Sequence, residues 1–193
     1  MQRGLRTLNA PVRAFEVLKT VSVTDGAASA TLSPANTLRI DFEIDFEDSA
    51  IGHQKKSLVM NNGSFARELC DSRTFCRQAD VDNMQANGLA LGGNPGENAV
   101  VFEGDRVLSP GGLRYADEPV RHKMLDALGD LALAGAPLIG HYTGVRAGHS
   151  MTNTLLRKLF ATPDAVRMIV CDASTAARLP GYGLAWDEIP AVA

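Results

Sequence analysis

The stretch VRHKMLDALGD, residues 120–130, places a histidine, a lysine and two aspartates among residues that favour a helix. Each residue of an α-helix advances by about 100°. His122, Asp126 and Asp130 therefore share one side of the expected helix, and the opposite side is apolar. That apolar side comprises Val120, Met124, Ala127, Leu128 and Leu131.

A neutral imidazole nitrogen and a carboxylate oxygen at positions i and i+4 can bind the same Zn²⁺ ion. Catalytic zinc usually has three protein ligands, so His122 and Asp126 form an incomplete set by themselves. The H-x-x-x-D spacing also arises often by chance. Spacing alone therefore leaves open an ordinary exposed helix face.

A second candidate lies in RAGHSMTNTLLRKLF, residues 146–160, where His149 stands in the first turn of another expected helix. Histidine exchanges a proton near neutral pH, so His149 could act as a general acid. The alternative is a solvated or helix-capping histidine. His53 and His141 fall in segments that resemble loops, and we expect both to be structural or surface residues.

The elements that must position these residues follow from periodicity. The segment 38–46 has apolar residues at every second position and charged residues between them, which predicts a strand with one buried face. Further strands are expected within 15–26, 28–32, 54–62, 97–109 and 165–172, and short helices at 63–72 and 78–88. Two longer helices are expected near 117–134 and 148–161, with 135–148 as their connection. Strands first and helices late predict an α+β fold, a two-layer sandwich of a mainly antiparallel sheet packed on two helices.

Composition sets the broad class. The chain has 193 residues, 45% of them hydrophobic and 21% charged, which is typical of a globular protein. Its net charge of −3 gives no reason to expect nucleic-acid binding, and no apolar run is long enough for stable membrane insertion. The three cysteines have no C-x-x-C spacing, which argues against a disulfide framework or a thiolate zinc site. A reduced, cytoplasmic protein fits these features best.

Five motifs occur in order along the chain: LRIDFEIDFEDSAIG, SRTF, GLALGGNPGENAVVF, LRYADEPVRHKMLDALGDLALAGAPLIG and AGHSMTNTLL. Together they resemble the C-terminal half of the bacterial UDP-3-O-acyl-N-acetylglucosamine deacetylases, the zinc enzymes of lipid A biosynthesis. The resemblance implies metal-assisted hydrolysis of the N-acetyl group of an acylated UDP-sugar, giving acetate and the free amine.

The resemblance also implies roles for individual residues. His122 and Asp126 would be zinc ligands, Asp130 would orient His149, and His149 would protonate the leaving amine or stabilise the oxyanion. Lys123 would contact the substrate or its developing charge, and Gly148 is assigned to substrate binding. A small β-α-β insert at about 74–107 would form a passage for the fatty acyl chain. Its candidate lining residues are Thr74, Phe75, Leu89, Leu91 and Val101.

One departure from the family pattern affects function. In the family a first domain supplies the general base and the third zinc ligand from a Thr-Val-Glu-His type motif, and this sequence contains no Glu-His dipeptide. We therefore expect a remnant of the preceding domain or linker at 1–12, the second deacetylase domain at 13–176 and an irregular tail at 177–193. We also expect a truncated, poorly active chain that self-associates or needs the missing domain as a partner. The alternative is a non-catalytic module that binds an acyl chain or another protein.

Overall fold

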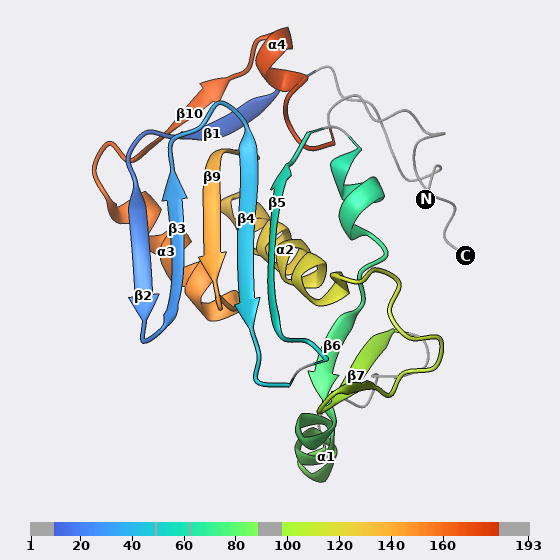
Figure 1. Cartoon of the computed structure of the whole chain (residues 1–193). Coiled ribbons are helices and arrows are strands. Elements are labelled where there is room, and N and C mark those ends of the chain that lie inside the picture. The colour runs from blue at the N-terminus through green and yellow to red at the C-terminus, as the bar shows by residue number, and fades with distance from the viewer. Residues whose placement is uncertain (1–9, 49, 62, 89–97, 182–193) are drawn as a thin grey trace.

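The computed structural model of the chain describes residues 10–48, 50–61, 63–88 and 98–181. A seven-stranded sheet forms its main layer (Figure 1). Its strands are β1 (Arg13–Val17), β2 (Val21–Asp25), β3 (Ala28–Ser33), β4 (Leu38–Asp45), β5 (His53–Val59), β9 (Leu138–Val145) and β10 (Val166–Val170). β9 lies at the centre and pairs with β4 in parallel and with β3 antiparallel. β5 and β2 continue the sheet on the two sides, and β1 pairs with the start of β9 and with β10.

Two helices cover one face of this sheet: α2 (Glu118–Leu131), which continues into the 3₁₀ turn η3 (Ala132–Ala134), and α3 (His149–Ala161) (Figure 1). The alternation along β4 explains this layering, because its even-numbered residues are buried under the helices and its odd-numbered residues are at least partly accessible. Burying a large apolar side chain contributes about 1.5–3 kcal/mol. The buried residues of β4 are Leu38, Ile40, Phe42 and Ile44, and those on α2 include Val120, Met124, Ala127 and Leu131. The predicted α+β sandwich is thus confirmed.

A smaller three-stranded sheet projects from one end of the sandwich (Figure 1). Its strands are β6 (Thr74–Arg77), β7 (Ala99–Glu103) and β8 (Arg106–Val107), and helix α1 (Gln78–Ala86) follows β6. β6 and β7 are parallel and joined through α1, which is the expected β-α-β arrangement. Phe75 of β6 connects this unit to the main layer. The centroid of its ring lies 5.5 Å from that of Phe46, which follows β4, and 6.2 Å from that of Phe102 in β7.

Two short elements complete the described residues. The π-helical turn η2 (Phe65–Leu69) precedes β6, and α4 (Ala173–Ala176) follows β10. None of the helices in the described ranges is both long and apolar enough to cross a bilayer.

The expectation of a connecting segment at 135–148 was wrong, because β9 is the central strand. The glycines of this strand allow close packing. A Cβ at Gly140 would lie 2.8 Å from Val17 Cγ2, and one at Gly144 would lie 2.8 Å from Phe42 Cε2. His141 is therefore a strand residue.

Two further sequence expectations need correction. His53 begins strand β5, so it is not in a loop. The segment 15–26 also forms two strands where one was expected. β1 ends at Val17 and pairs with β9 and β10, whereas β2 begins at Val21 and pairs with β3. Alternation alone cannot show that the chain changes partners between the two.

A buried ion pair ties the start of α2 to the chain before β6. Arg73 Nε donates to Glu118 Oε1 at 2.9 Å, and only 1% of the Glu118 side chain is exposed. Burial opposes ionisation of Glu118, but hydrogen bonds from Arg73 and Arg114 outweigh it and lower the pKa of the carboxyl group. The carboxylate is therefore charged at neutral pH.

Candidate active site

The tertiary structure brings the polar stripe of α2 next to the first residue of α3. His122, Asp126 and Asp130 lie on the same side of α2, and their side chains are only 15%, 16% and 14% exposed. His149 begins α3 and is 64% exposed. The three α2 residues are therefore sheltered, unlike an ordinary solvated helix face.

The ring of His122 is oriented by a backbone carbonyl. Its Nδ1 lies 3.1 Å from the carbonyl oxygen of Ser72. A carbonyl only accepts hydrogen bonds, so Nδ1 carries the proton and the Nε2 lone pair of the neutral ring is free. No sequence signal identified Ser72, because the contact uses its backbone and spans fifty residues.

Asp126 lies opposite this lone pair. His122 Nε2 is 3.3 Å from Asp126 Oδ1, and Lys123 Nζ donates to Asp126 Oδ2 at 2.8 Å. A lone pair facing a carboxylate is repulsive unless a proton or a metal cation lies between them. The donor set of His122 and Asp126 therefore fits a cation that prefers nitrogen and oxygen ligands, as Zn²⁺ does.

His149 has a comparable arrangement with Asp130. Its Nδ1 lies 3.0 and 2.9 Å from the two carboxylate oxygens of Asp130, which accept a hydrogen bond from Nδ1–H. His149 Nε2 is 3.9 Å from Asp126 Oδ2. The Nε2 atoms of both imidazoles therefore lie near the same carboxylate, and both rings are held by hydrogen bonds at Nδ1.

These groups open onto a pocket of about 380 Å³ between α2, α3 and the small sheet. Its lining residues are Phe46, Thr74, Phe75, Cys76, Arg77, Asp80, His122, Lys123, Asp126 and His149. The ring of Phe75 stands edge-on to that of His122, with centroids 6.4 Å apart. The pocket thus combines ionisable groups from the helices with an aromatic wall from the insert.

Other predicted residues lie outside this lining. Val101 is buried within the small sheet, with 2% of its surface exposed. Asp130 is not a lining residue, but it forms a hydrogen bond with His149, which is one. Gly148 precedes His149 at the start of α3. Leu89 and Leu91 lie outside the described residues.

Four lining residues were absent from the predicted site. Arg77 donates to both oxygens of Asp80, at 2.8 and 3.1 Å, and this contact lowers the pKa of Asp80. Burial raises the pKa of the Cys76 thiol, which therefore stays protonated at neutral pH. Phe46 closes the pocket from the end of β4. The contribution of Phe46 could not be read from the sequence, because it depends on where the insert folds.

The candidate metal site is incomplete within the described residues. No group of three or more histidine, cysteine, aspartate or glutamate side chains in those ranges is arranged to hold a metal ion. His122 and Asp126 supply two suitable donors, one fewer than catalytic zinc usually has. A third donor would have to come from outside the described ranges.

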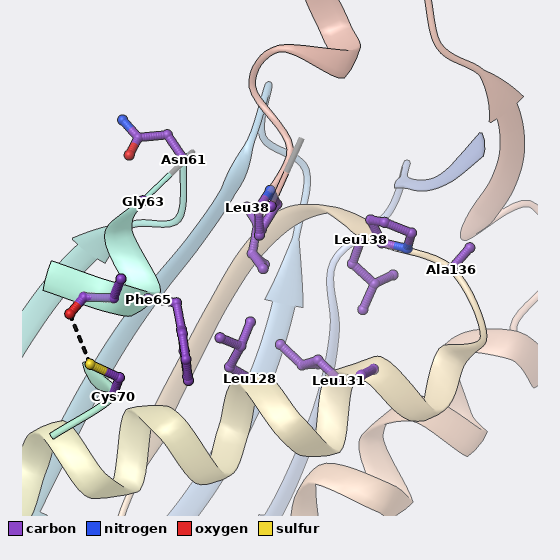
Figure 2. Close-up of a pocket in the computed structure, with 14 residues that line it drawn as sticks. Leu38, Asn61, Gly63, Phe65, Cys70, Leu128, Leu131, Ala136 and Leu138 are labelled. Atoms are coloured by element: carbon purple, nitrogen blue, oxygen red, sulfur yellow. Dashed lines mark hydrogen bonds between the residues drawn. The ribbon is translucent and has the colours of Figure 1, made fainter. Parts of the chain in front are cut away.

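A second cavity, of about 580 Å³, lies at the other end of α2 (Figure 2). Leu128 and Leu131 of α2 face Leu38 and Leu138 of the sheet, and Phe65 lies beside them. None of the described residues that line it is charged. This cavity therefore offers apolar surface without acid–base groups and contains none of the predicted site residues.

Comparison with known proteins yields a consistent set of relatives. The sequence model of the family described as UDP-3-O-acyl N-acetylglycosamine deacetylase matches residues 1–161. The UDP-3-O-acyl-N-acetylglucosamine deacetylase of Phenylobacterium zucineum is 50% identical over 165 residues, which cover 86% of this chain and 56% of that protein. The protein of the same name from Anaeromyxobacter sp. is 40% identical over 181 residues, covering 93% and 59% of the two chains. That from Myxococcus xanthus is 40% identical over 186 residues, covering 96% and 58%. The chain thus spans somewhat more than half the length of these relatives.

Proposed function

Because the chain belongs to the UDP-3-O-acyl N-acetylglycosamine deacetylase family, we propose that it forms part of a zinc-dependent amide hydrolase. The reaction removes the N-acetyl group of UDP-3-O-acyl-N-acetylglucosamine in lipid A biosynthesis, releasing acetate and the free amine. One observation carries the proposal. His122 and His149 are both held through Nδ1, and both Nε2 atoms lie near Asp126 at one pocket.

His122 Nε2 and Asp126 are the residues that would hold zinc, and bound zinc would supply a Lewis acid for hydrolysis of the amide. The hydrogen bond to Ser72 favours the His122 tautomer whose Nε2 can bind a metal. Lys123 balances charge on Asp126 and places an ammonium group at the pocket, where it can contact an anionic part of the substrate.

His149 is the proposed general acid. In a doubly protonated ring, Nδ1–H donates a hydrogen bond to Asp130 and Nε2 carries a second proton. That second proton can be transferred to the leaving nitrogen or hydrogen-bonded to the oxyanion. Asp130 is a positioning residue, since it holds the ring and stabilises its positive charge.

Substrate recognition is assigned to the insert side of the pocket. Thr74 and Phe75 line the pocket directly. Val101, Leu89 and Leu91 remain proposed contacts for the fatty acyl chain, and Gly148 remains a proposed contact beside His149.

The chain by itself is expected to be a weak zinc binder and a negligible catalyst. It contains no Glu-His dipeptide to supply the base and third ligand. We propose that residues 13–176 act as the second domain of a two-domain enzyme, between a linker at 1–12 and a tail at 177–193, with the first domain as the partner. Cys70, Cys76 and Cys171 form no disulfide, and we place the reaction in the bacterial cytoplasm.

The test compares His122→Ala with a matched control, His53→Ala. His53 pairs with Glu43 at 2.9 Å on the uncovered face of the sheet and is not among the residues that line the pocket. Acetate release would be measured after adding a relative's first domain in trans, and zinc content by elemental analysis. The expected result is loss of both signals in His122→Ala and retention of both in His53→Ala. Full turnover by His122→Ala would contradict the proposed site, and stoichiometric zinc with turnover from this chain alone would contradict its incompleteness.

A further inference from the structure

One peptide unit is held from both sides by the same helix. The carbonyl of Ser72 accepts from His122 Nδ1 at 3.1 Å, and the N–H of the next residue, Arg73, donates to Glu118 Oε1 at 3.0 Å. Glu118 and His122 stand at positions i and i+4 of α2, so they lie on the same side of the helix. We propose that Glu118, anchored by its ion pair with Arg73, is a positioning residue: by accepting the backbone N–H of residue 73 it fixes the tautomer and orientation of the His122 ring.

The carboxylate of Glu118 is fully engaged. Its Oε1 accepts from Arg73 N and Nε, and its Oε2 accepts from Arg73 Nη2 at 3.0 Å and from Arg114 N at 2.7 Å. A carboxylate offers about four lone-pair sites, so the group cannot rotate without losing a hydrogen bond. Arg73 Nη2 also donates to the carbonyl of Gly112 at 2.7 Å. The ion pair is therefore a rigid anchor.

Glu118 affects the orientation of His122 through the planar peptide unit between Ser72 and Arg73. Because the peptide unit is planar, holding the N–H of Arg73 on Glu118 fixes the direction of the Ser72 carbonyl. That carbonyl keeps the proton on His122 Nδ1 and leaves the Nε2 lone pair 3.3 Å from Asp126. The use of this lone pair for zinc rests on the proposed function, but the orientation of the ring does not.

The first test uses the unmodified, metal-free chain. The ¹⁵N chemical shifts of an imidazole distinguish the nitrogen that carries hydrogen from the one that carries a lone pair. In the alkaline range, where imidazoles are neutral, we expect the Nδ1–H tautomer for His122. A predominant Nε2–H tautomer would overturn the proposal without any variant.

The second test compares two double variants, Arg73→Met/Glu118→Gln and Arg73→Met/Glu118→Met. Both remove the ion pair without leaving an unpaired buried charge, but only the Gln variant keeps an oxygen that can accept the N–H of residue 73. We expect the Gln variant to retain the parent tautomer and the Met variant to populate both tautomers. Zinc affinity, measured by competition with a chromophoric chelator, should be about tenfold to a hundredfold weaker in the Met variant.

A third variant, Leu156→Ala, controls for lost stability, because Leu156 is a buried residue of α3. It should lower the melting temperature and leave the His122 tautomer unchanged. A folded Met variant with the parent tautomer would refute the positioning role. If that variant does not fold, the parent chain and the Gln variant still test the proposal, because a predominant Nε2–H tautomer in either would overturn it. A tautomer change in a chain that binds no zinc even when a relative's first domain is added would support the positioning role and contradict the proposed function.

Discussion

Replacing Glu118 by glutamine should strongly destabilise the chain while changing few atoms. The carboxylate accepts four hydrogen bonds, from three donors of Arg73 and from the backbone N–H of Arg114. An amide replaces one acceptor oxygen by an NH₂ donor, which must then face another donor. The substitution also leaves the Arg73 guanidinium, whose side chain is 8% exposed, without a counter-charge.

The expected loss follows from this burial. Breaking a buried ion pair by neutralising one partner costs about 3–5 kcal/mol, because the remaining charge stays desolvated. Domains are stable by only about 5–15 kcal/mol, so Glu118→Gln would remove a large fraction of the free energy of unfolding. For a chain of this length the melting temperature should fall by roughly 6–20 °C.

The assay is urea unfolding followed by circular dichroism, repeated between neutral and acidic pH. The folded-state pKa of Glu118 is lowered, so its stabilisation is complete above the unfolded value of about 4.3 and is lost as pH falls through the folded value. The variant has no charge at this position. The difference in unfolding free energy between parent and variant should therefore be largest near neutral pH and shrink below about pH 4.

A matched control makes the same chemical change in a more exposed pair. Glu68 pairs with Arg121 at 2.8 Å and is 36% exposed, so Glu68→Gln should cost less than about 1 kcal/mol. If Glu118→Gln costs no more than Glu68→Gln, or if its effect does not depend on pH, the account of a buried charged anchor is refuted.

Three smaller predictions concern packing and buried polar groups. Gly129→Ala should stabilise the chain by up to about 1 kcal/mol in urea unfolding, since a Cβ there meets no atom within 4 Å; a loss of stability would reveal a neighbour on that side of α2. Gly144→Ala should instead cost about 1–3 kcal/mol by the same assay, because its Cβ would lie 2.8 Å from Phe42 and 2.9 Å from Tyr142; an unchanged midpoint would contradict this close packing. Tyr142→Phe should cost about 1 kcal/mol in thermal unfolding, because the buried hydroxyl bonds Thr152 Oγ1 at 2.9 Å; a neutral result would contradict a net stabilisation by this hydrogen bond.

Local patterns in the sequence determined several features of this protein. The alternation along residues 38–46 predicted a strand with one buried face, and the helical spacing of His122, Asp126 and Asp130 predicted their common side of α2. Both predictions succeed because the periods of strands and helices are local properties of the backbone. The family resemblance likewise depends on the order of motifs and needs no coordinates.

Other features were decided only by the tertiary structure. The segment of β9 was expected to be a connection between the helices, but it is the central strand of the sheet, and its neighbours leave no room for larger side chains at Gly140 and Gly144. The partner of His122 is the backbone carbonyl of Ser72, and a carbonyl is present at every residue, so no sequence pattern can single it out. The approach of His149 to Asp130 likewise depends on how α3 packs beside α2 on the sheet. The sequence determined which residues could perform the chemistry, and long-range packing decided which of their atoms meet.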